Sequence, residues 1–362
     1  MNKPPMLAVD NLKVHLPLGR SGLLRPAQML RAVDGLSFSV LPGSSVGIVG
    51  ESGSGKSTAA KAIMRAIPVT SGTIHLDGVD ITRMEGTALR AMRHRFQMIF
   101  QDPASALNPR QRAAAIIREP LDLLDIGNAR ERNETVREML TAVGLSGEAG
   151  HLFAHQFSGG QRQRLMIARA LVSKPDIVLC DEAVSALDMA VQAQILNLLR
   201  RLQQDFGLTF VFISHNLGVV QYLCDYIAVM YLGRIVEYAP AVSLFSGPRH
   251  PYSWALMASA VPPGTFRAAL KKRFAMSGEV PSPIHPPAGC RLAPRCPFSL
   301  PKCAQEEPLL QSQFFQSADG ITHEHRAACH RATEIAAMGE TLLARKARPA
   351  EDENANGGMF SI

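Results

Sequence analysis

The spacing of apolar and polar residues is typical of strands in some segments of this chain and of helices in others, and the pattern predicts an α/β fold. Apolar and polar residues tend to alternate over 7–16 and 36–40, as they do in half-buried strands. Continuous apolar runs, which are typical of buried parallel strands, occupy 46–49 and 177–180, and another buried strand is predicted over 208–213. Helical spacing is found over 113–144 and 191–205. The sequence therefore predicts one large domain of the α/β class.

The last third of the chain differs from the rest, which predicts a separate C-terminal module over 241–331. Helical and strand periodicity weakens after Tyr231, and proline becomes frequent between Pro240 and Pro308. The tail over 332–362 is rich in Ala, Glu, Gly and Asn, and we expect it to be disordered.

Composition and charge restrict the class of protein further. The 362 residues are 46% hydrophobic and 19% charged, which is enough for one large domain with an appendage. No apolar stretch reaches the ~18 residues of a membrane helix, and no signal-peptide core is found, so we expect a cytoplasmic protein. The net charge of +7 permits a nucleic-acid or anionic-membrane partner. The basic residues are scattered, however, and a solvated basic surface is the simpler interpretation.

A phosphate-binding loop, called the P-loop below, follows the first buried run. Residues 50–58 read G-E-S-G-S-G-K-S-T and match the pattern G-x-x-x-x-G-K-[ST] at every specified position. Its glycines let backbone N–H groups turn toward phosphate oxygens, and the following helix adds the positive end of its dipole. Lys56 is expected to reach the β- and γ-phosphates, and Ser57 to ligate Mg²⁺. The residues expected to bind a nucleoside triphosphate are Gly50, Glu51, Ser52, Gly53, Ser54, Gly55, Lys56, Ser57 and Thr58.

Two carboxylates follow the apolar run 177–180. A carboxylate at a strand end beside a P-loop can hold Mg²⁺ through water, which suits Asp181. The next residue, Glu182, would face the γ-phosphate and polarise or deprotonate the attacking water. A solvated turn is the alternative, and the intact P-loop upstream favours hydrolysis.

A second anion-binding turn is predicted where a helix over 161–171 begins. Its residues are Ser158, Gly159, Gly160 and Gln161. One chain cannot easily present two such turns to the same γ-phosphate. We therefore expect this turn to bind a nucleotide held by a second subunit. A helix N-cap with flexible glycines is the alternative.

The six cysteines divide into two groups. Cys180 and Cys224 lie in apolar segments and are expected to be small core residues. The others have the spacing C-x5-C-x6-C-x25-C, at Cys290, Cys296, Cys303 and Cys329. Such clustering in a cytosolic chain suggests metal binding before disulfides. Four thiolates match either one Zn²⁺ or a 4Fe–4S cluster, although these spacings are wider than those typical of structural zinc. The spare candidates for a Cys3His site are His323, His325 and His330, and four unrelated thiols are the other alternative.

The motifs stand in the order found in ATPase subunits of ABC transporters, and the chain resembles that family. The order is the P-loop, Gln101, 157–161, 181–182, 185–188 and His215. More narrowly, it resembles the ATP-binding subunits of dipeptide, oligopeptide and nickel importers. The segments with matching phrasing are 100–103, 105–110, 184–188, 191–194, 230–233 and 250–253. The resemblance covers about 7–331.

The resemblance implies a P-loop NTPase core with an antiparallel β subdomain and a helical subdomain at about 102–172 within a nucleotide-binding domain over 1–240. It implies that Gln101 senses Mg²⁺ and nucleotide and couples to the permease. It places Asp188 at a dimer seam and His215 at the γ-phosphate, although from the residues alone His215 could equally be a core or capping histidine. Ser57, Gln101 and Asp181 become the expected Mg²⁺ ligands.

The resemblance also concerns the cysteines, and the chain differs from the family pattern at two positions. In the family, cysteines at the positions of Cys290 and its three companions are associated with a 4Fe–4S cluster, which the resemblance favours over zinc. His15 stands where the family usually has an aromatic residue that stacks on adenine, and it is the candidate for that contact. Ala183 stands where the family often has proline after the glutamate.

The function implied is ATP hydrolysis that energises an importer of peptides or related small solutes. The expected partners are two transmembrane permease subunits, a second and paralogous ATPase in a heterodimer, and indirectly a substrate-binding protein. The expected location is peripheral, on the cytoplasmic face of the cell membrane. The alternative is an ABC ATPase that acts on nucleic acid or ribosomes. Such proteins usually carry two ATPase halves or a long coiled-coil insertion, and this chain has one P-loop and no heptad run, so we expect no nucleic-acid partner.

Overall fold

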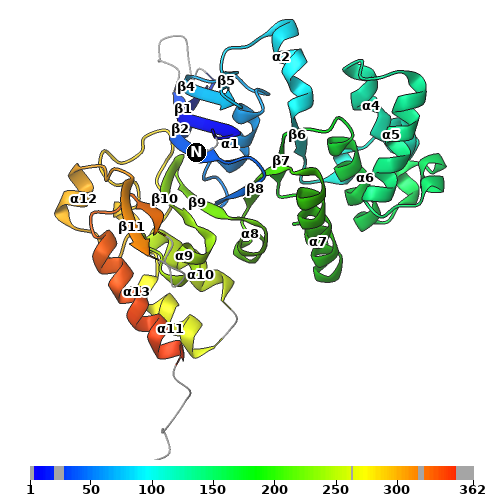
Figure 1. Ribbon diagram of the computed structural model, residues 1–362. Coiled ribbons are helices and arrows are strands. Elements are labelled where there is room, and N and C mark those ends of the chain that lie inside the picture. The colour runs from blue at the N-terminus through cyan, green and yellow to red at the C-terminus, as the bar shows by residue number, and fades with distance from the viewer. Residues whose placement is uncertain (1–3, 20–27, 262–263, 317–321, 348–362) are drawn as a thin grey trace, which may run out of the picture.

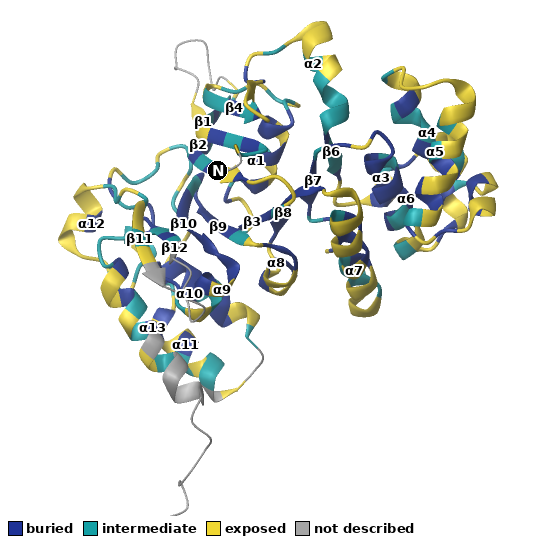
Figure 2. Cartoon of the chain, viewed as in Figure 1, coloured by how far each residue is buried: buried dark blue, intermediate teal, exposed yellow. Residues whose placement is uncertain are grey.

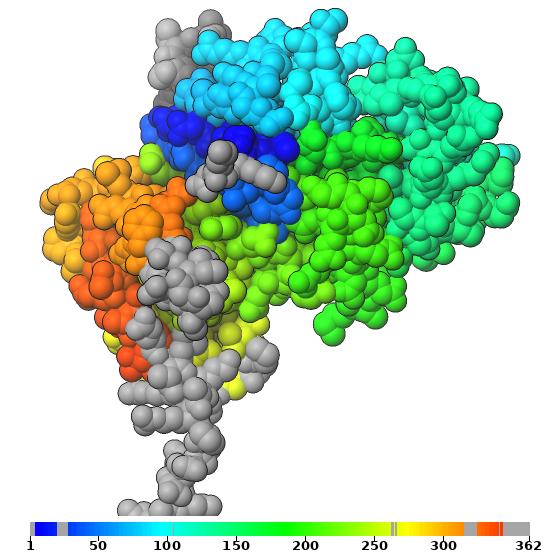
Figure 3. All heavy atoms as spheres, viewed as in Figure 1, coloured from blue at the N-terminus to red at the C-terminus, as the bar shows by residue number. Residues whose placement is uncertain are grey.

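The computed structural model describes residues 4–19, 28–261, 264–316 and 322–347. Within these residues the strands form two sheets, and helices cover the larger sheet and extend to one side of it (Figure 1). The helices α4 and α5 lie at one end of the molecule, and the C-terminal elements lie at the other (Figures 1 and 3).

The smaller sheet is antiparallel and has the strand order β2-β1-β4-β5. Its strands are β1 (Leu7–Pro17), β2 (Met29–Val40), β4 (Ser71–Leu76) and β5 (Val79–Asp80). The alternation of the sequence explains its buried face, because Leu7, Val9, Leu12 and Val14 are all nearly inaccessible. The run 36–40 proves to be the end of a longer strand, β2.

The larger sheet has the order β11-β12-β10-β9-β3-β8-β7-β6 among the described residues. Its parallel strands are β3 (Ser45–Val49), β6 (Phe96–Ile99), β7 (Ile177–Asp181) and β8 (Thr209–Ser214), and β9 (Tyr226–Tyr231) runs parallel to β3. Every residue of β3, β7 and β8 is buried (Figure 2), which is why these strands read as continuous apolar runs. Their carboxyl ends meet at one edge of the sheet, where ligands bind in open α/β sheets.

Helices α1 (Lys56–Ile63), α7 (Met189–Phe206) and α8 (Leu217–Leu223) follow strands of this sheet. A helical arm lies beyond β6 and contains α3 (Pro103–Ala106), α4 (Ala113–Leu123), α5 (Ala129–Ala142) and α6 (Gly159–Leu171). Between β5 and β6 lies α2 (Gly86–Met92). No helix within the described residues is long and apolar enough to span a bilayer.

The C-terminal module continues the larger sheet. After β10 (Arg234–Pro240) its helices are α9 (Ala241–Ser246), α10 (Pro251–Ala260), α11 (Thr265–Phe274) and α12 (Pro301–Gln305). The hairpin of β11 (Gln311–Gln316) and β12 (Thr322–Ala327) adds to the sheet edge, because β12 pairs antiparallel with β10. Trp254 of α10 is buried and stacks on Phe274 with ring centroids 5.1 Å apart.

The expectation of a disordered tail from residue 332 was wrong for its first part. Residues Ala332–Ala347 form a helix, α13. Ile335, Met338 and Leu342 recur at helical spacing and pack against the core, so this segment has an apolar stripe despite its Ala and Glu content. The rest of the predicted tail, 348–362, lies outside the described residues.

Candidate functional site

The P-loop connects β3 to α1 in a close-packed turn. A Cβ on Gly50 would lie 2.1 Å from the carbonyl oxygen of Met230, and a Cβ on Gly55 would lie 2.1 Å from that of Ala32. Gly55 also has a left-handed φ of +104°. Only glycine fits at these two positions. The loop thus brings backbone N–H groups to the N-terminus of α1, where an anion is favoured.

Lys56 and the carboxylates around it define the charge of the loop. The Lys56 ammonium donates to the carbonyl oxygens of Gly50 and Glu51, each at 2.8 Å. Burial lowers the pKa of Lys56, and the negative charges of Glu182, Asp181 and Glu51 oppose that shift.

Ser57 and Asp181 bring two oxygen ligands together. The Ser57 hydroxyl donates to Asp181 Oδ1 at 3.1 Å, so the start of α1 meets the end of β7. Burial raises the pKa of Asp181, while the Ser57 hydrogen bond lowers it. Hydroxyl and carboxylate oxygens are the ligand types that Mg²⁺ prefers, so these residues fit that ion.

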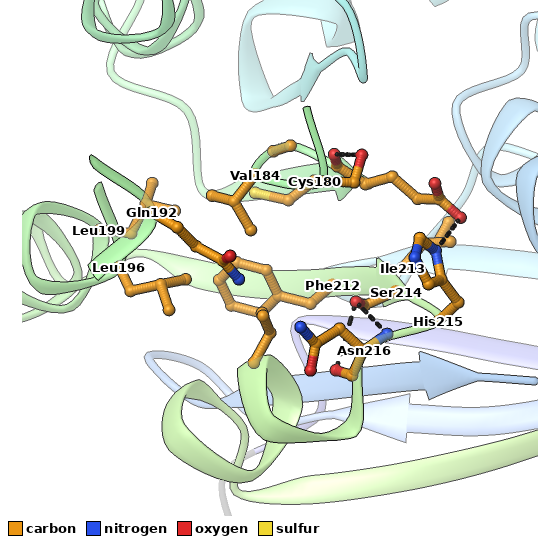
Figure 4. A pocket seen from close by; sticks show the side chains of 14 residues that line it. Cys180, Val184, Gln192, Leu196, Leu199, Phe212, Ile213, Ser214, His215 and Asn216 are labelled. Atoms are coloured by element: carbon orange, nitrogen blue, oxygen red, sulfur yellow. Dashed lines mark hydrogen bonds and ion pairs between the residues drawn. The ribbon is translucent and has the colours of Figure 1, made fainter. Parts of the chain in front are cut away.

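Glu182 lies between two side chains from neighbouring strand ends. Its Oε2 accepts a hydrogen bond from Gln101 Nε2 at 3.0 Å. Its Oε1 lies 3.0 Å from Nδ1 of His215, which is labelled in Figure 4. Gln101 follows β6 and His215 follows β8. The backbone of Glu182 is left-handed, with φ +48°, and its N–H donates to the Ile213 carbonyl at 2.9 Å. The fold therefore holds this carboxylate in a fixed direction.

A pocket of about 270 Å³ lies over the P-loop. Its lining residues are Leu30, Arg31, Ala32, Ser52, Gly53, Gly55, Lys56, Ser57, Thr58, Glu182, Leu232, Gly233 and Pro283. The phosphate-binding residues and Glu182 thus share one opening. Leu30, Arg31, Ala32 and Pro283 were not identified from the sequence, because no local pattern marks them. Leu232 and Gly233 lie in the matching segment 230–233 but were given no role. Pro283 comes from the C-terminal module.

His15 does not line this pocket. Its Nε2 lies 2.8 Å from Asp34 Oδ1, and Asp34 is also paired with Arg291 and, at 3.7 Å, with Arg234. Burial alone would raise the pKa of Asp34, but the hydrogen bonds from Arg291 and His15 and the arginine charges lower it to about 2. The structure places the His15 ring at this buried carboxylate.

The second predicted anion-binding turn lies apart from the P-loop pocket. Ser158 caps α6, with its hydroxyl accepting from the Gln161 N–H at 3.4 Å, and Asp188 caps α7 by accepting from Val191 N–H at 2.9 Å. A Cβ on Gly160 would lie 2.6 Å from Val191 Cγ1, so the two helix starts are packed together. The residues Ser158 and Gly159 are exposed. The structure thus packs this turn against the start of α7, and the N–H groups of Ser158 and Gln161 are bonded within a capping box at the exposed end of α6.

The four C-terminal cysteines lie near enough to influence one another electrostatically. Among the described residues, no three His, Cys, Asp or Glu side chains lie close enough to hold a metal ion. Each of the four thiols accepts at least one backbone N–H. The donors are Leu292 and Ala293 for Cys290, Phe298 for Cys296, Leu300 for Cys303, and Arg331 for Cys329. Burial raises the pKa of Cys329 to about 12, and the other three thiols add to the shift.

The candidate histidines for this module lie elsewhere. His325 is buried against Glu237 with its Nε2 at 2.6 Å from the carboxylate, and His330 bonds to the Glu306 carbonyl at 3.0 Å. The side chain of His323 lies outside the described residues. The expectation that Cys180 and Cys224 are core residues is confirmed, because they are only 1% and 7% exposed.

Sequence comparison supplies the family. Residues 33–185 match the family model described as "ABC transporter". The "Oligopeptide transport ATP-binding protein AppF" of Bacillus subtilis is 43% identical over 332 residues, which is 91% of this chain and 98% of that protein. The chain belongs to the ABC transporter family. Residues 236–303 also match "Oligopeptide/dipeptide transporter, C-terminal region".

Further relatives agree with this family. The "Probable peptide ABC transporter ATP-binding protein y4tS" of Sinorhizobium fredii is 48% identical over 305 residues, which is 84% of this chain and 86% of that protein. The structure titled "Dimeric structure of a post-hydrolysis state of the ATP-binding cassette MJ0796 bound to ADP and Pi" has a TM-score of 0.58 at 27% identity and covers 65% of this chain and 99% of that one. The domain is therefore an ABC ATPase, as the sequence predicted.

Proposed function

We propose that this ABC ATPase hydrolyses MgATP to drive the import of peptides or related small solutes, from the cytoplasmic face of the cell membrane. The observation that carries the proposal is the pairing of a complete P-loop pocket with an importer-type C-terminal region, matched over 236–303. Relatives similar over 84% and 91% of the chain are named for peptide transport. The alternative of an ABC ATPase acting on nucleic acid has no comparable observation in its favour.

The contacts support specific roles in hydrolysis. Ser57, Asp181 and the amide oxygen of Gln101 would hold Mg²⁺, which would neutralise charge on the transferred phosphoryl group. Glu182 would accept the proton of the attacking water, because its carboxylate is the base directed into the P-loop pocket. His215 would fix the direction of that carboxylate and contact the γ-phosphate.

The site is proposed to be completed by a second ATPase subunit. Ser158 to Gln161 present a helix start at the surface and away from the P-loop of the same chain. Two chains arranged head to tail would bring each such turn to the other's nucleotide, with Asp188 at the seam. The related cassette structure, whose title describes a dimer bound to ADP and Pi, is consistent with this arrangement. We propose a paralogous partner, as the resemblance implies.

Purification from membranes tests the proposed function. A tagged copy of the full chain, extracted gently, should retain two permease subunits and a second ATPase. The matched control is a copy lacking the tag. Recovery of ribosomal RNA or DNA in place of permeases would contradict the importer function and favour the nucleic-acid alternative.

We also propose that the four C-terminal cysteines bind one 4Fe–4S cluster. The support for this proposal is the set of four cysteines, which matches the Cys₄ ligation of such a cluster, together with the resemblance described above. The backbone N–H groups directed at all four sulfurs would stabilise thiolates there. The cluster would supply order to a proline-rich segment.

Anaerobic purification tests the cluster. The protein should be brown, with iron and sulfide near four each per chain. Cys296→Ser should lower both contents, whereas Cys224→Ala, in the core, should not. A colourless preparation, with one zinc ion or with no metal, would contradict the proposal.

A further inference from the structure

The C-terminal module contacts the P-loop directly. Arg295 Nη1 lies 3.1 Å from the Glu51 carboxylate, and Tyr252 accepts the backbone N–H of Glu51 at 2.7 Å. The carbonyl of Pro283 accepts the N–H of Arg31 at 3.2 Å. Glu51 belongs to the P-loop, and Arg31 lines the pocket above it. The P-loop is thus held from outside the ATPase core.

Contacts other than the one with Glu51 also hold the Arg295 side chain in position. Its side chain is only 12% exposed, its guanidinium carbon lies 5.9 Å from the Tyr231 ring centroid, and its Nη1 donates to the Tyr231 hydroxyl at 3.4 Å. Tyr231 in turn packs against Tyr252 with centroids 4.7 Å apart. Arg295 precedes Cys296 in a short 3-10 turn, Ala293–Arg295. The module therefore presents a preorganised cation to the P-loop.

The charge of Glu51 explains why such a cation matters. Glu51 places a carboxylate on a loop whose other features favour anions, and its charge acts on Lys56. A free carboxylate there would repel the phosphates of a bound nucleotide. Arg295 pairs with this carboxylate at 3.1 Å and so offsets its charge.

We propose that Arg295 is a positioning residue for nucleotide binding, which acts by neutralising Glu51 on the P-loop. The role rests on the proposed function, because it requires that the P-loop binds a nucleoside triphosphate. It makes the C-terminal module part of the nucleotide site. Phosphate affinity in this chain then depends on the folding of the cysteine-bearing segment.

The proposal has a signature that a purely structural role lacks. The repulsion released by Arg295→Gln grows with ligand charge, so ATP should lose more affinity than ADP, and adenosine should lose none. We expect ATP affinity to fall by about five- to tenfold at low ionic strength, and the loss to shrink as salt is added. Glu51→Gln in the same chain should restore ATP affinity, because it removes the uncompensated charge.

Calorimetric titration of the full-length chain with ATP, ADP and adenosine measures these effects. Arg295→Lys keeps the charge and should retain most of the ATP affinity. This variant tests the proposal even if Arg295→Gln does not fold. Lys302→Gln is the matched control, because it removes an exposed cation of the same module that pairs with Glu306. It should bind ATP as the unaltered chain does.

Three results would overturn the proposal. Unchanged ATP affinity in Arg295→Gln would show that the contact is neutral. A loss that is equal for ATP and adenosine, and that Glu51→Gln does not restore, would show a structural role only. Failure of the unaltered chain to bind ATP at all would overturn the proposed function together with this inference, so the two failures are distinguishable.

Discussion

At the scale of single residues, Glu51 joins the P-loop to the C-terminal module, because both Tyr252 and Arg295 bond to it. The P-loop, Asp181 and Glu182 were predicted because each motif follows a buried strand whose end fixes its place. Tyr252 and Arg295 contact Glu51 although they lie 201 and 244 residues away from it in the sequence. The periodicity of a sequence contains no information on such distant pairs. The proposed stacking role of His15 has no support here, since its ring bonds to Asp34.

Asp34 leads to a prediction about acid stability. Its pKa is lowered to about 2 from an ordinary 3.8, so its charged form stabilises the fold above about pH 4, and that contribution is lost as the pH falls toward 2. Asp34→Asn also leaves Arg291 buried without its partner, and we expect a cost of about 3 kcal/mol at neutral pH. Urea unfolding between pH 7 and pH 3 measures the difference from the unaltered chain. The difference should narrow below about pH 4, and a gap that stays constant would contradict this account.

At the scale of elements, the apolar runs predicted the central strands, and the helical spacing over 191–205 predicted α7. The hairpin of β11 and β12 and the helix α13 were missed, because proline-rich flanks and an Ala- and Glu-rich composition masked them. Both elements are stabilised by tertiary contacts, β12 by pairing with β10 and α13 by packing on the core.

The contact of α13 with α10 gives a prediction of unusual sign. Gly339 is buried, and a Cβ there would lie 1.7 Å from Trp254 Cζ2. Helix propensity alone would make Gly339→Ala stabilising by about 1 kcal/mol. We expect instead a loss of about 1–3 kcal/mol, because Trp254 or α13 must move. Thermal unfolding and protease cleavage within α13 measure it, and a rise in stability would show that α13 does not pack on Trp254.

At the scale of the whole molecule, the nucleotide-binding domain and the C-terminal module both contribute to the nucleotide site. The carboxyl ends of the parallel strands gather Ser57, Gln101, Asp181, Glu182 and His215 at one sheet edge, and the C-terminal module holds the P-loop from the other side. The helix start at Ser158 faces outward, so the proposed complete site needs a second subunit. The central claim is that Glu182 is the base of ATP hydrolysis in an assembled importer.

Peptide-stimulated ATP hydrolysis by the importer, reconstituted in vesicles with its permeases and binding protein, tests this claim most directly. Glu182→Gln should lower the hydrolysis rate by about 10²- to 10⁴-fold while ATP still binds, because the amide cannot accept the proton of water. Glu138→Gln, exposed on α5, serves as the matched control and should leave the rate unchanged. Near-normal hydrolysis by Glu182→Gln would contradict the account.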